Sequence, residues 1–302
     1  MSLTALALAA PPQAERPVVS TADVHRFVDA LHRIGVDDHT CPAFRAYFAS
    51  ASSGLKAYAS KFDVGTRELC AAIRSRPEWY ATIEGKLPAL DSAGAQVQAV
   101  FSAYLRFDPE AVLPGVYFVV GNGISGGTTV GWRKPIVLIG VERTGRTDKL
   151  ASTIAHEFIH TQQHYPLMGT MTGGPRFMRG SLLRHSIKEG SANLIAELLT
   201  GTRQGNAYGE THAAALWREF LAVMRDTNYD RWLYNGWNAK ALGERPPDLG
   251  YWMGYQISKA YYDKATDKRR AIHEMLSIRD FDQFVAESGY TGVALTGVST
   301  PF

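Results

Sequence analysis

The chain has 302 residues, 45% of them hydrophobic, so it can bury a substantial core in one large domain or two closely joined lobes. Its 32 basic and 29 acidic side chains leave a formal charge of +3, a balance that argues against a nucleic-acid partner or an anionic membrane surface. No apolar run approaches the roughly 18 residues that a membrane-spanning helix needs. Function must therefore be inferred from motifs.

Residues 1–19 begin with small and apolar side chains, and Ala7-Leu8-Ala9 fits a signal-peptidase site. The stretch is short and lacks a positively charged start, so it is either the remnant of a secretion signal or a disordered tail. Export to the periplasm or medium is one prediction, and a cytoplasmic location is the alternative. Cys41 and Cys70 could form a disulfide in an exported protein, but the sequence favours two buried thiols.

Residues 20–110 are predicted to form an N-terminal helical region. Apolar residues recur at helical spacing from Val24 to Ile34, and further helices are predicted over 43–62, 67–74, 78–83 and 95–105. None of these segments carries a recognisable catalytic group. We expect the region to pack against the catalytic part of the chain.

The pattern changes after Pro109. Runs of β-branched and aromatic residues, separated by glycine-rich turns, predict strands over 116–120, 126–132 and 136–141. We expect a small sheet just before the next helix. The segment around Gly127 and Thr128 is a candidate edge strand that binds an extended peptide through its main chain, and an ordinary hairpin is an equally good interpretation.

The helix after the sheet is predicted to begin near Asp148 and to end at Pro166, and it contains His156-Glu157-Phe158-Ile159-His160. Two histidines four residues apart lie on one helix face, so both can bind a single metal ion. Glu157 then lies beside the metal, where it can take a proton from a bound water. The pattern predicts one catalytic Zn²⁺ ion, with His156 and His160 as ligands and Glu157 as general base.

Catalytic zinc usually has three protein ligands and one open position, so a third ligand is needed. A second helix is predicted from Ser181 to Thr200, and it carries Glu189, followed by Gly190, which leaves room for the two helices to approach. Glu197, two turns further on, is the alternative. His164 lies one turn past His160, but three ligands along one helix would span roughly 12 Å, so we expect His164 to be a solvated residue at the rim.

Beyond these helices the chain is predicted to be helical again. Further helices are expected over 211–225, 251–263, 271–276 and 280–288. The predicted organisation is an N-terminal helical region over 20–110, a catalytic core with sheet and metal helices over 111–205, and a C-terminal helical lobe over 206–302. The fold class is α+β and mostly helical.

His156, His160 and Glu189 resemble the ligands of the gluzincin branch of the zincin metalloproteases. The longer pattern resembles a bacterial family of predicted zinc-dependent proteases, over about residues 115–290. The segments that carry this resemblance are Ile154–Glu157, Lys188–Ala192, Gly250–Tyr255 and Phe284–Tyr290. It implies a zincin-like core with a small sheet, an active-site helix and a helical C-terminal lobe, and a peptide or protein substrate.

The resemblance also implies roles for single residues. Many gluzincins have an Asp four residues after the third ligand, where it holds the first histidine; here that residue is Asn193, a neutral partner. Gluzincins commonly stabilise the oxyanion with a Tyr or His of the C-terminal lobe, for which Tyr255 is favoured and Tyr251 and His212 are alternatives.

Peptide-bond hydrolysis is the predicted activity. A degenerate zincin that binds zinc or peptide without hydrolysis is one alternative, and a hydrolase of non-peptide amides or esters is another, because fold and ligands do not separate these from proteolysis. The retained Glu157 argues against the first alternative, since a purely structural metal site has no use for a base there.

Overall fold

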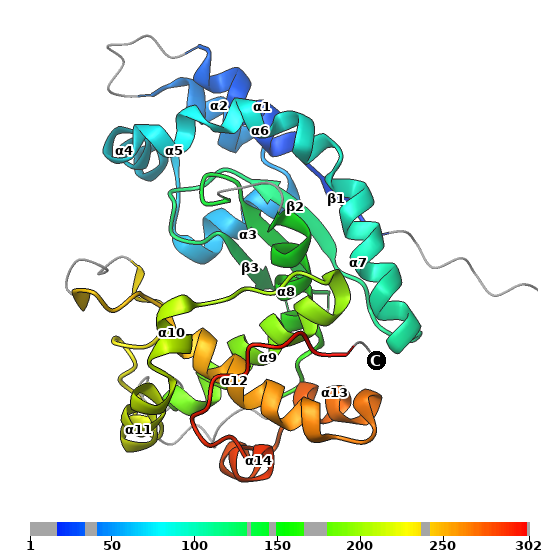
Figure 1. Cartoon of the computed structure of the whole chain (residues 1–302). Coiled ribbons are helices and arrows are strands. Elements are labelled where there is room, and N and C mark those ends of the chain that lie inside the picture. Colours follow the sequence, from blue (N-terminus) through cyan, green and yellow to red (C-terminus); the bar gives the residue numbers. More distant parts are fainter. Residues whose placement is uncertain are drawn as a thin grey trace, which may run out of the picture.

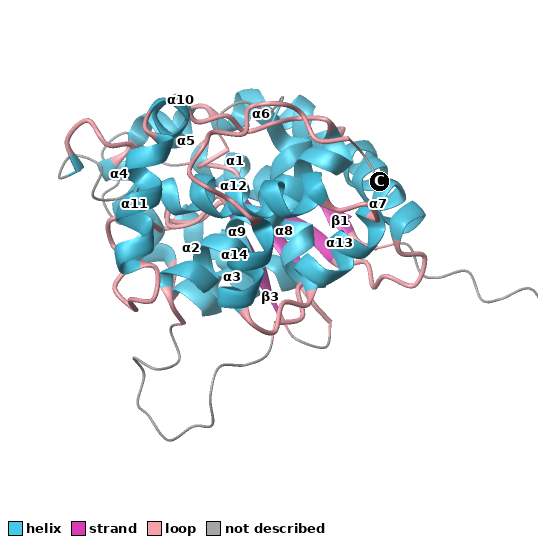
Figure 2. Ribbon diagram, turned by 60° about the horizontal axis from the view of Figure 1, so that its bottom comes forward, coloured by secondary structure: helices cyan, strands magenta, loops and turns pink. Residues whose placement is uncertain are grey.

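The computed structural model describes residues 17–33, 41–131, 134–144, 149–165, 180–236 and 242–300. This part of the chain is mostly helical with one four-stranded sheet, which confirms the predicted α+β class. The N-terminal helices, blue to cyan in Figure 1, lie above and beside the sheet, and the C-terminal helices, yellow to red, form the lower part. The strands form a small patch among the helices in Figure 2.

The N-terminal region contains seven helices in its described part. They are α1 (Ala22–Leu31), α2 (Ala43–Ala49), α3 (Ser53–Phe62), α4 (Thr66–Ser75), α5 (Pro77–Ala81), α6 (Ile83–Asp91) and α7 (Ala93–Phe107). The single helix predicted over 43–62 is two helices, because the Ser52 side chain accepts hydrogen bonds from the backbone N–H groups of Gly54 and Leu55 and starts α3 anew. Helix α6 was not predicted, since Pro88 inside it argues for a break.

The sheet has the strand order β1-β2-β4-β3. Its strands are β1 (Val19–Ser20), β2 (Gly115–Val119), β3 (Gly127–Val130) and β4 (Ile136–Gly140). The three predicted strands are present. Strand β1 was not predicted, because two residues are too few to show a period, and it falls partly in the segment predicted to be a tail. β1 and β2 pair in parallel, as do β2 and β4, and β3 runs antiparallel to β4 at the edge of the described sheet.

The two faces of the sheet are covered by different helices. Tyr117, Leu138 and Thr128 are register partners on one face, and α3 packs there so closely that a Cβ on Gly54 would lie 2.3 Å from the Tyr117 side chain. Gly127 belongs to the opposite face, which faces α8 (Leu150–Gln162). The edge strand β3 therefore lies between a helix of the N-terminal region and the helix that carries the histidines.

The lower part of the molecule begins with the second metal helix. Ser181 caps α9 (Leu182–Thr200) by accepting from the Arg184 N–H group, and Gly201 ends it with φ +69°, as predicted. The helices that follow are α10 (Ala207–Thr211), α11 (Ala213–Val223), α12 (Leu249–Lys264), α13 (Lys268–Leu276) and α14 (Phe281–Ser288). The predicted boundary residues Asp148 and Pro166 lie outside the described residues, as do residues 1–16 and Trp132. None of the described helices combines the length and the apolar character needed to cross a membrane.

Helices α9 and α12 cross in direct backbone contact. A Cβ on Gly254 would lie 1.7 Å from the Ser186 carbonyl oxygen, and a Cβ on Gly190 would lie 2.0 Å from the Gly254 carbonyl carbon. The sequence assigned Gly190 to the contact between the two metal helices, and the structure corrects this, because Gly190 faces α12. The two glycines fix the position of α9 and thereby of Glu189, the residue before Gly190.

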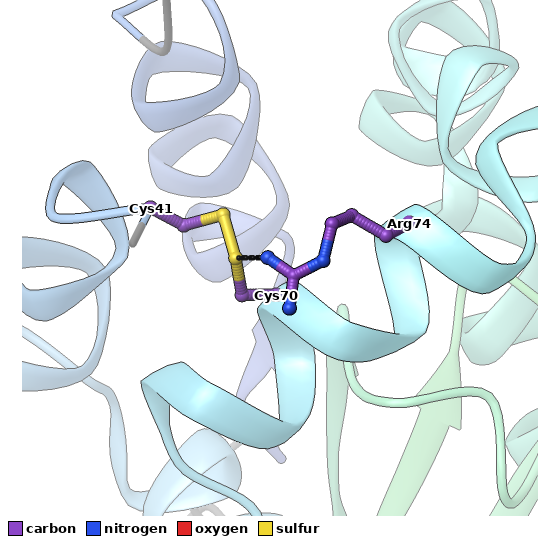
Figure 3. The surroundings of a disulfide bond; sticks show 3 residues. All are labelled: Cys41, Cys70 and Arg74. Atoms are coloured by element: carbon purple, nitrogen blue, oxygen red, sulfur yellow. Dashed lines mark hydrogen bonds between the residues drawn. A yellow bond between two sulfur atoms is a disulfide. The ribbon is translucent and has the colours of Figure 1, made fainter. Parts of the chain in front are cut away.

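The expectation of two buried thiols is wrong, because Cys41 and Cys70 form a disulfide that spans 29 residues. Their Cα atoms are 6.0 Å apart, within the usual range for a disulfide. The bond ties Cys41, which directly precedes Pro42 at the start of α2, to Cys70 in the middle of α4. The Arg74 guanidinium lies beside the Cys70 sulfur (Figure 3). Sequence spacing alone carries no information on this proximity.

Candidate metal centre

Three side chains predicted as zinc ligands converge between α8 and α9. The Nε2 atoms of His156 and His160 are 3.0 Å apart, and Glu189 Oε2 lies 3.3 Å from the first and 2.9 Å from the second. The three side chains are 12%, 7% and 5% exposed, in that order. Among the described residues they form a group of metal-ligating side chains whose donor atoms all lie within 4.8 Å of one another.

The geometry of this group fits a zinc ion. Ligands bound to tetrahedral zinc at about 2.0–2.1 Å lie roughly 3.3 Å from one another. The observed separations of 2.9–3.3 Å are close to that value. Two imidazole nitrogens and one carboxylate oxygen are also a donor set typical of catalytic zinc, which leaves a fourth position for water or substrate.

Gln163, three residues after His160 at the end of α8, orients the His160 ring. The Gln163 Oε1 atom lies 2.8 Å from His160 Nδ1, so the ring can donate its N–H there and keep Nε2 free for a metal. The Gln163 amide nitrogen donates to the Lys188 carbonyl oxygen at 2.8 Å and to Ser191 Oγ at 3.2 Å. One side chain thus fixes a ligand on α8 and ties it to the segment of α9 that carries Glu189.

Replacing Gln163 by Ala is expected to weaken zinc binding roughly tenfold, because residues that orient metal ligands contribute at about that level. Competition with a chromophoric chelator measures the zinc Kd. The matched control is Gln283→Ala, which removes an exposed amide bonded to Glu287 on α14 and leaves the Kd unchanged. An unchanged Kd in the Gln163 variant would mean that the packing of α8 alone fixes His160.

The first histidine lacks the partner that the sequence predicted. His156 Nδ1 is buried and has no hydrogen-bond partner in the described part of the chain, so Asn193 does not hold it. Asn193 instead lines a cavity of about 290 Å³ together with Tyr251 and Trp252. The ring of Tyr251 stacks on that of His156, with centroids 6.2 Å apart and planes at 28°, so aromatic packing orients this ligand.

The second oxygen of Glu189 has its own partners. Tyr234 donates its hydroxyl to Glu189 Oε1 at 2.7 Å, and Lys188 Nζ lies 3.3 Å from the same atom. Burial by itself would raise the pKa of Glu189, but the charges of His160 and Lys188 and the hydrogen bonds from the histidines outweigh it and hold that pKa well below its usual range. Glu189 is therefore a carboxylate at neutral pH, as a ligand must be.

Glu157 lies against the edge strand. Its carboxylate is buried, and a Cβ on Gly127 would lie 2.5 Å from Glu157 Oε1. Any side chain at Gly127 would therefore displace the carboxylate or the strand. The structure thus brings together two features that the sequence predicted separately, the general base and the edge-strand segment.

The candidates for oxyanion stabilisation are spread over the lower part of the molecule. Tyr255 donates its hydroxyl to Glu197 Oε2 at 2.6 Å, so this hydroxyl is hydrogen-bonded to a carboxylate outside the group of candidate ligands. The ring of the exposed His212 stacks on Tyr208 with centroids 4.0 Å apart. Of the predicted residues, Tyr251 is the one in contact with a metal-site histidine.

Sequence reasoning missed Tyr234. It lies in a loop with no periodicity, and its φ of +55° is unusual for a side-chain-bearing residue, so no local pattern singles it out.

His164 is exposed, as expected, and lies outside the cluster of candidate ligands. Its backbone N–H donates to the Leu276 carbonyl oxygen.

Comparison with protein families gives one match, to residues 117–280, which is more than half of the chain. The matched range includes β3, both histidine- and glutamate-bearing helices α8 and α9, and all of α12 and α13, and thus all three candidate ligands, Glu157 and Gly127. Comparisons with curated proteins and with solved structures found no match. The chain therefore belongs to the family described as predicted Zn-dependent protease (DUF2268).

Proposed function

We propose that this protein is a zinc-dependent metallopeptidase with a zincin-like core of the gluzincin type. The observation that supports this most directly is the convergence of His156, His160 and Glu189, with Glu157 packed beside the edge strand of the sheet. We assign the catalytic core to residues 111–205, with helical regions over 20–110 and 206–302 on either side of it.

Each residue of the centre has a definite task in this proposal. A zinc ion held by the three ligands would supply a Lewis acid and lower the pKa of water to about 7. Glu157 accepts the proton of the attacking water and returns it to the leaving amine. Its placement directly after His156 on α8 puts the carboxylate beside the ligands, and the absence of a side chain at Gly127 makes room for it.

The free edge of β3 is the natural place for a peptide substrate. Gly126 accepts a hydrogen bond from the Gly140 N–H group on β4, and pairing alternates along antiparallel strands. The backbone groups of Gly127 and Thr129 therefore point away from β4, toward the outer edge. Their two carbonyl oxygens accept there from Ser125 Oγ and Lys61 Nζ, respectively. A peptide that pairs there shares or displaces these two hydrogen bonds. An extended peptide that adds there as a further strand would bring its backbone past Glu157.

Tyr234 is the oxyanion donor in this proposal. Its hydroxyl donates to Glu189 Oε1 at 2.7 Å, and desolvation of that hydroxyl together with the Glu189 charge raises its pKa far above the usual value, so it stays protonated. To stabilise an oxyanion, the hydroxyl would shift this single hydrogen bond from Glu189 to the substrate. Almost half of the residue is exposed, which leaves it accessible to substrate.

Tyr234→Phe is expected to lower kcat roughly 100-fold, the typical effect of losing one oxyanion donor, with KM and zinc content little changed. Tyr229→Phe is the matched control, because its ring packs edge-on against Tyr234 with centroids 6.0 Å apart. Loss of zinc from the Tyr234 variant, with no effect on kcat once zinc is restored, would assign Tyr234 to metal binding alone.

The disulfide supports the predicted export of the protein over the alternative of a cytoplasmic location. Structural disulfides persist in oxidising compartments and are rare in the cytosol. Trapping the thiols of the expressed protein with an alkylating reagent in intact cells tests this proposal: unmodified Cys41 and Cys70 support export, and quantitative modification contradicts it.

The activity itself is tested by incubating zinc-loaded protein with a diverse peptide library and identifying the products by mass spectrometry. Cleavage that a chelator abolishes and added zinc restores is the expected result. Protein that holds one zinc ion but cleaves no peptide would sink the peptidase proposal and favour a non-peptide amide or a binding role.

A further inference from the structure

The N-terminal region contributes one charged side chain to the edge of the sheet. Lys61, at the end of α3, directs its ammonium to Thr128 Oγ1 and to the Thr129 carbonyl oxygen, the latter at 3.0 Å. No catalytic group could be recognised in this region from the sequence. Lys61 nevertheless contacts the strand on which the substrate is proposed to lie.

The position of Lys61 follows from the two faces of the sheet. Thr128 points to the α3 face and Gly127 to the opposite face, where Glu157 lies. The Thr129 carbonyl group points to the free edge, so the Lys61 ammonium extends from the α3 face around that edge. A strand added to β3 would lie about 4.8 Å away, with the ammonium beside it.

The partners of the Lys61 ammonium within the described residues are neutral. No ion pair joins Lys61 to an acidic side chain within the described ranges, and its two partners are neutral oxygens. Lys61 is exposed as a residue, but partial desolvation of its ammonium lowers its pKa; the negative charge of Glu157 opposes this shift and the positive charge of Lys188 adds to it. The charges of Glu157 on α8 and of Lys188 on α9 therefore both act on the Lys61 ammonium.

We propose that Lys61 is a specificity-determining residue that binds a carboxylate of the substrate, so that the enzyme prefers peptides with an acidic group near the cleaved bond. The proposal rests on the proposed peptidase function. Side chains of an added strand alternate between the two faces, and one that points to the α3 face beside Thr128 comes within reach of Lys61. The carboxylate is supplied either by an Asp or Glu side chain or by the chain terminus.

The test compares substrates that differ by one charge. Peptides cleaved by the wild type are resynthesised with Glu or Gln at each position around the cleaved bond, each with a free and an amidated C-terminus. Lys61→Met removes the charge and keeps the length of the side chain, and Lys61→Arg keeps the charge. Lys56→Met, at an exposed lysine on the same helix, is the matched control.

We expect the wild type to prefer Glu over Gln at one position by about tenfold in kcat/KM, as for a partly solvated charge-assisted hydrogen bond. Lys61→Met should abolish this preference, because kcat/KM for the Glu peptide falls about tenfold more than kcat/KM for the Gln peptide, while Lys61→Arg and Lys56→Met retain the preference. A preference that follows the free C-terminus instead of Glu identifies the terminus as the source. Equal losses for both peptides in Lys61→Met would overturn the proposal and leave Lys61 as an anchor of β3.

A second readout separates this proposal from the peptidase function. The zinc-loaded Glu157→Gln protein is used to capture peptides from the same library, and the captured peptides are identified by mass spectrometry. Enrichment of acidic peptides that Lys61→Met removes supports carboxylate binding even where no peptide is cleaved. Capture with no enrichment of acidic peptides, or no capture at all, contradicts it.

Discussion

We expect the replacement of Glu157 by Gln to lower kcat for peptide hydrolysis, the proposed activity, roughly 1,000-fold and to leave one zinc ion per chain. The amide has the size and shape of the carboxylate, so it fits the same space against Gly127, but it cannot accept a proton from water at neutral pH. Because the proposed ligands are His156, His160 and Glu189, the zinc site should be unaffected. Turnover and zinc content of the same preparation, measured together, test both halves of this expectation.

The control for this variant is Glu110→Gln, at an exposed position far from α8 in sequence, and it retains full activity. Two outcomes would contradict the assignment. Retained activity would mean that another group takes the proton. Loss of zinc along with activity would mean that Glu157 supports the metal site, so the drop in kcat would carry no information on base catalysis.

The proximity of the three candidate ligands could be predicted from sequence because they lie in elements that obey local rules. The periodicity of a helix places His156 and His160 on one face whatever the rest of the fold does. Glu189 is found through the Ser181 cap and the Gly201 stop, which define the second helix without tertiary information. The three strands are likewise visible as short β-branched runs between glycines.

Two of the residues that sequence reasoning missed come to the site through tertiary structure. Tyr234 reaches Glu189 from a loop, and Lys61 reaches the edge strand from α3. Gln163 contacts His160 locally, three residues further along the chain, but its pattern does not distinguish it from a solvated residue at a helix end. Each is an ordinary polar residue in its own segment. The disulfide and the two-residue strand β1 were missed for the same reason as Tyr234 and Lys61, since both depend on a partner far away in the chain.

Gly190 was correctly predicted to lie at a close approach between helices, but its partner helix was predicted wrongly. A glycine within a helix indicates that another helix comes near, and it does not indicate which helix. The structure shows that α12 is that partner and that the contact is made by backbone on both sides. The position of Glu189 therefore depends on a crossing outside the metal centre.

Gly254→Ala is accordingly expected to lower the free energy of unfolding by about 3 kcal/mol, the upper part of the range for overpacking, because its Cβ would lie 1.7 Å from the Ser186 carbonyl oxygen. Neither backbone can yield without moving α9 against α12. Since Glu189 lies one turn from Ser186 on α9, the same shift should also weaken zinc binding. Denaturant unfolding of the metal-free protein measures the first effect, and chelator competition measures the second.

The matched control makes the same chemical change where space is free. Gly85 lies exposed within α6 with nothing within 4 Å of an added Cβ, so Gly85→Ala should raise the free energy of unfolding by about 0.5–1 kcal/mol through helix propensity. Opposite signs for the two variants would attribute the Gly254 effect to the helix crossing. If both variants were neutral, α9 and α12 would be able to move apart at little cost, and the geometry of the ligands would have to be fixed from the α8 side alone.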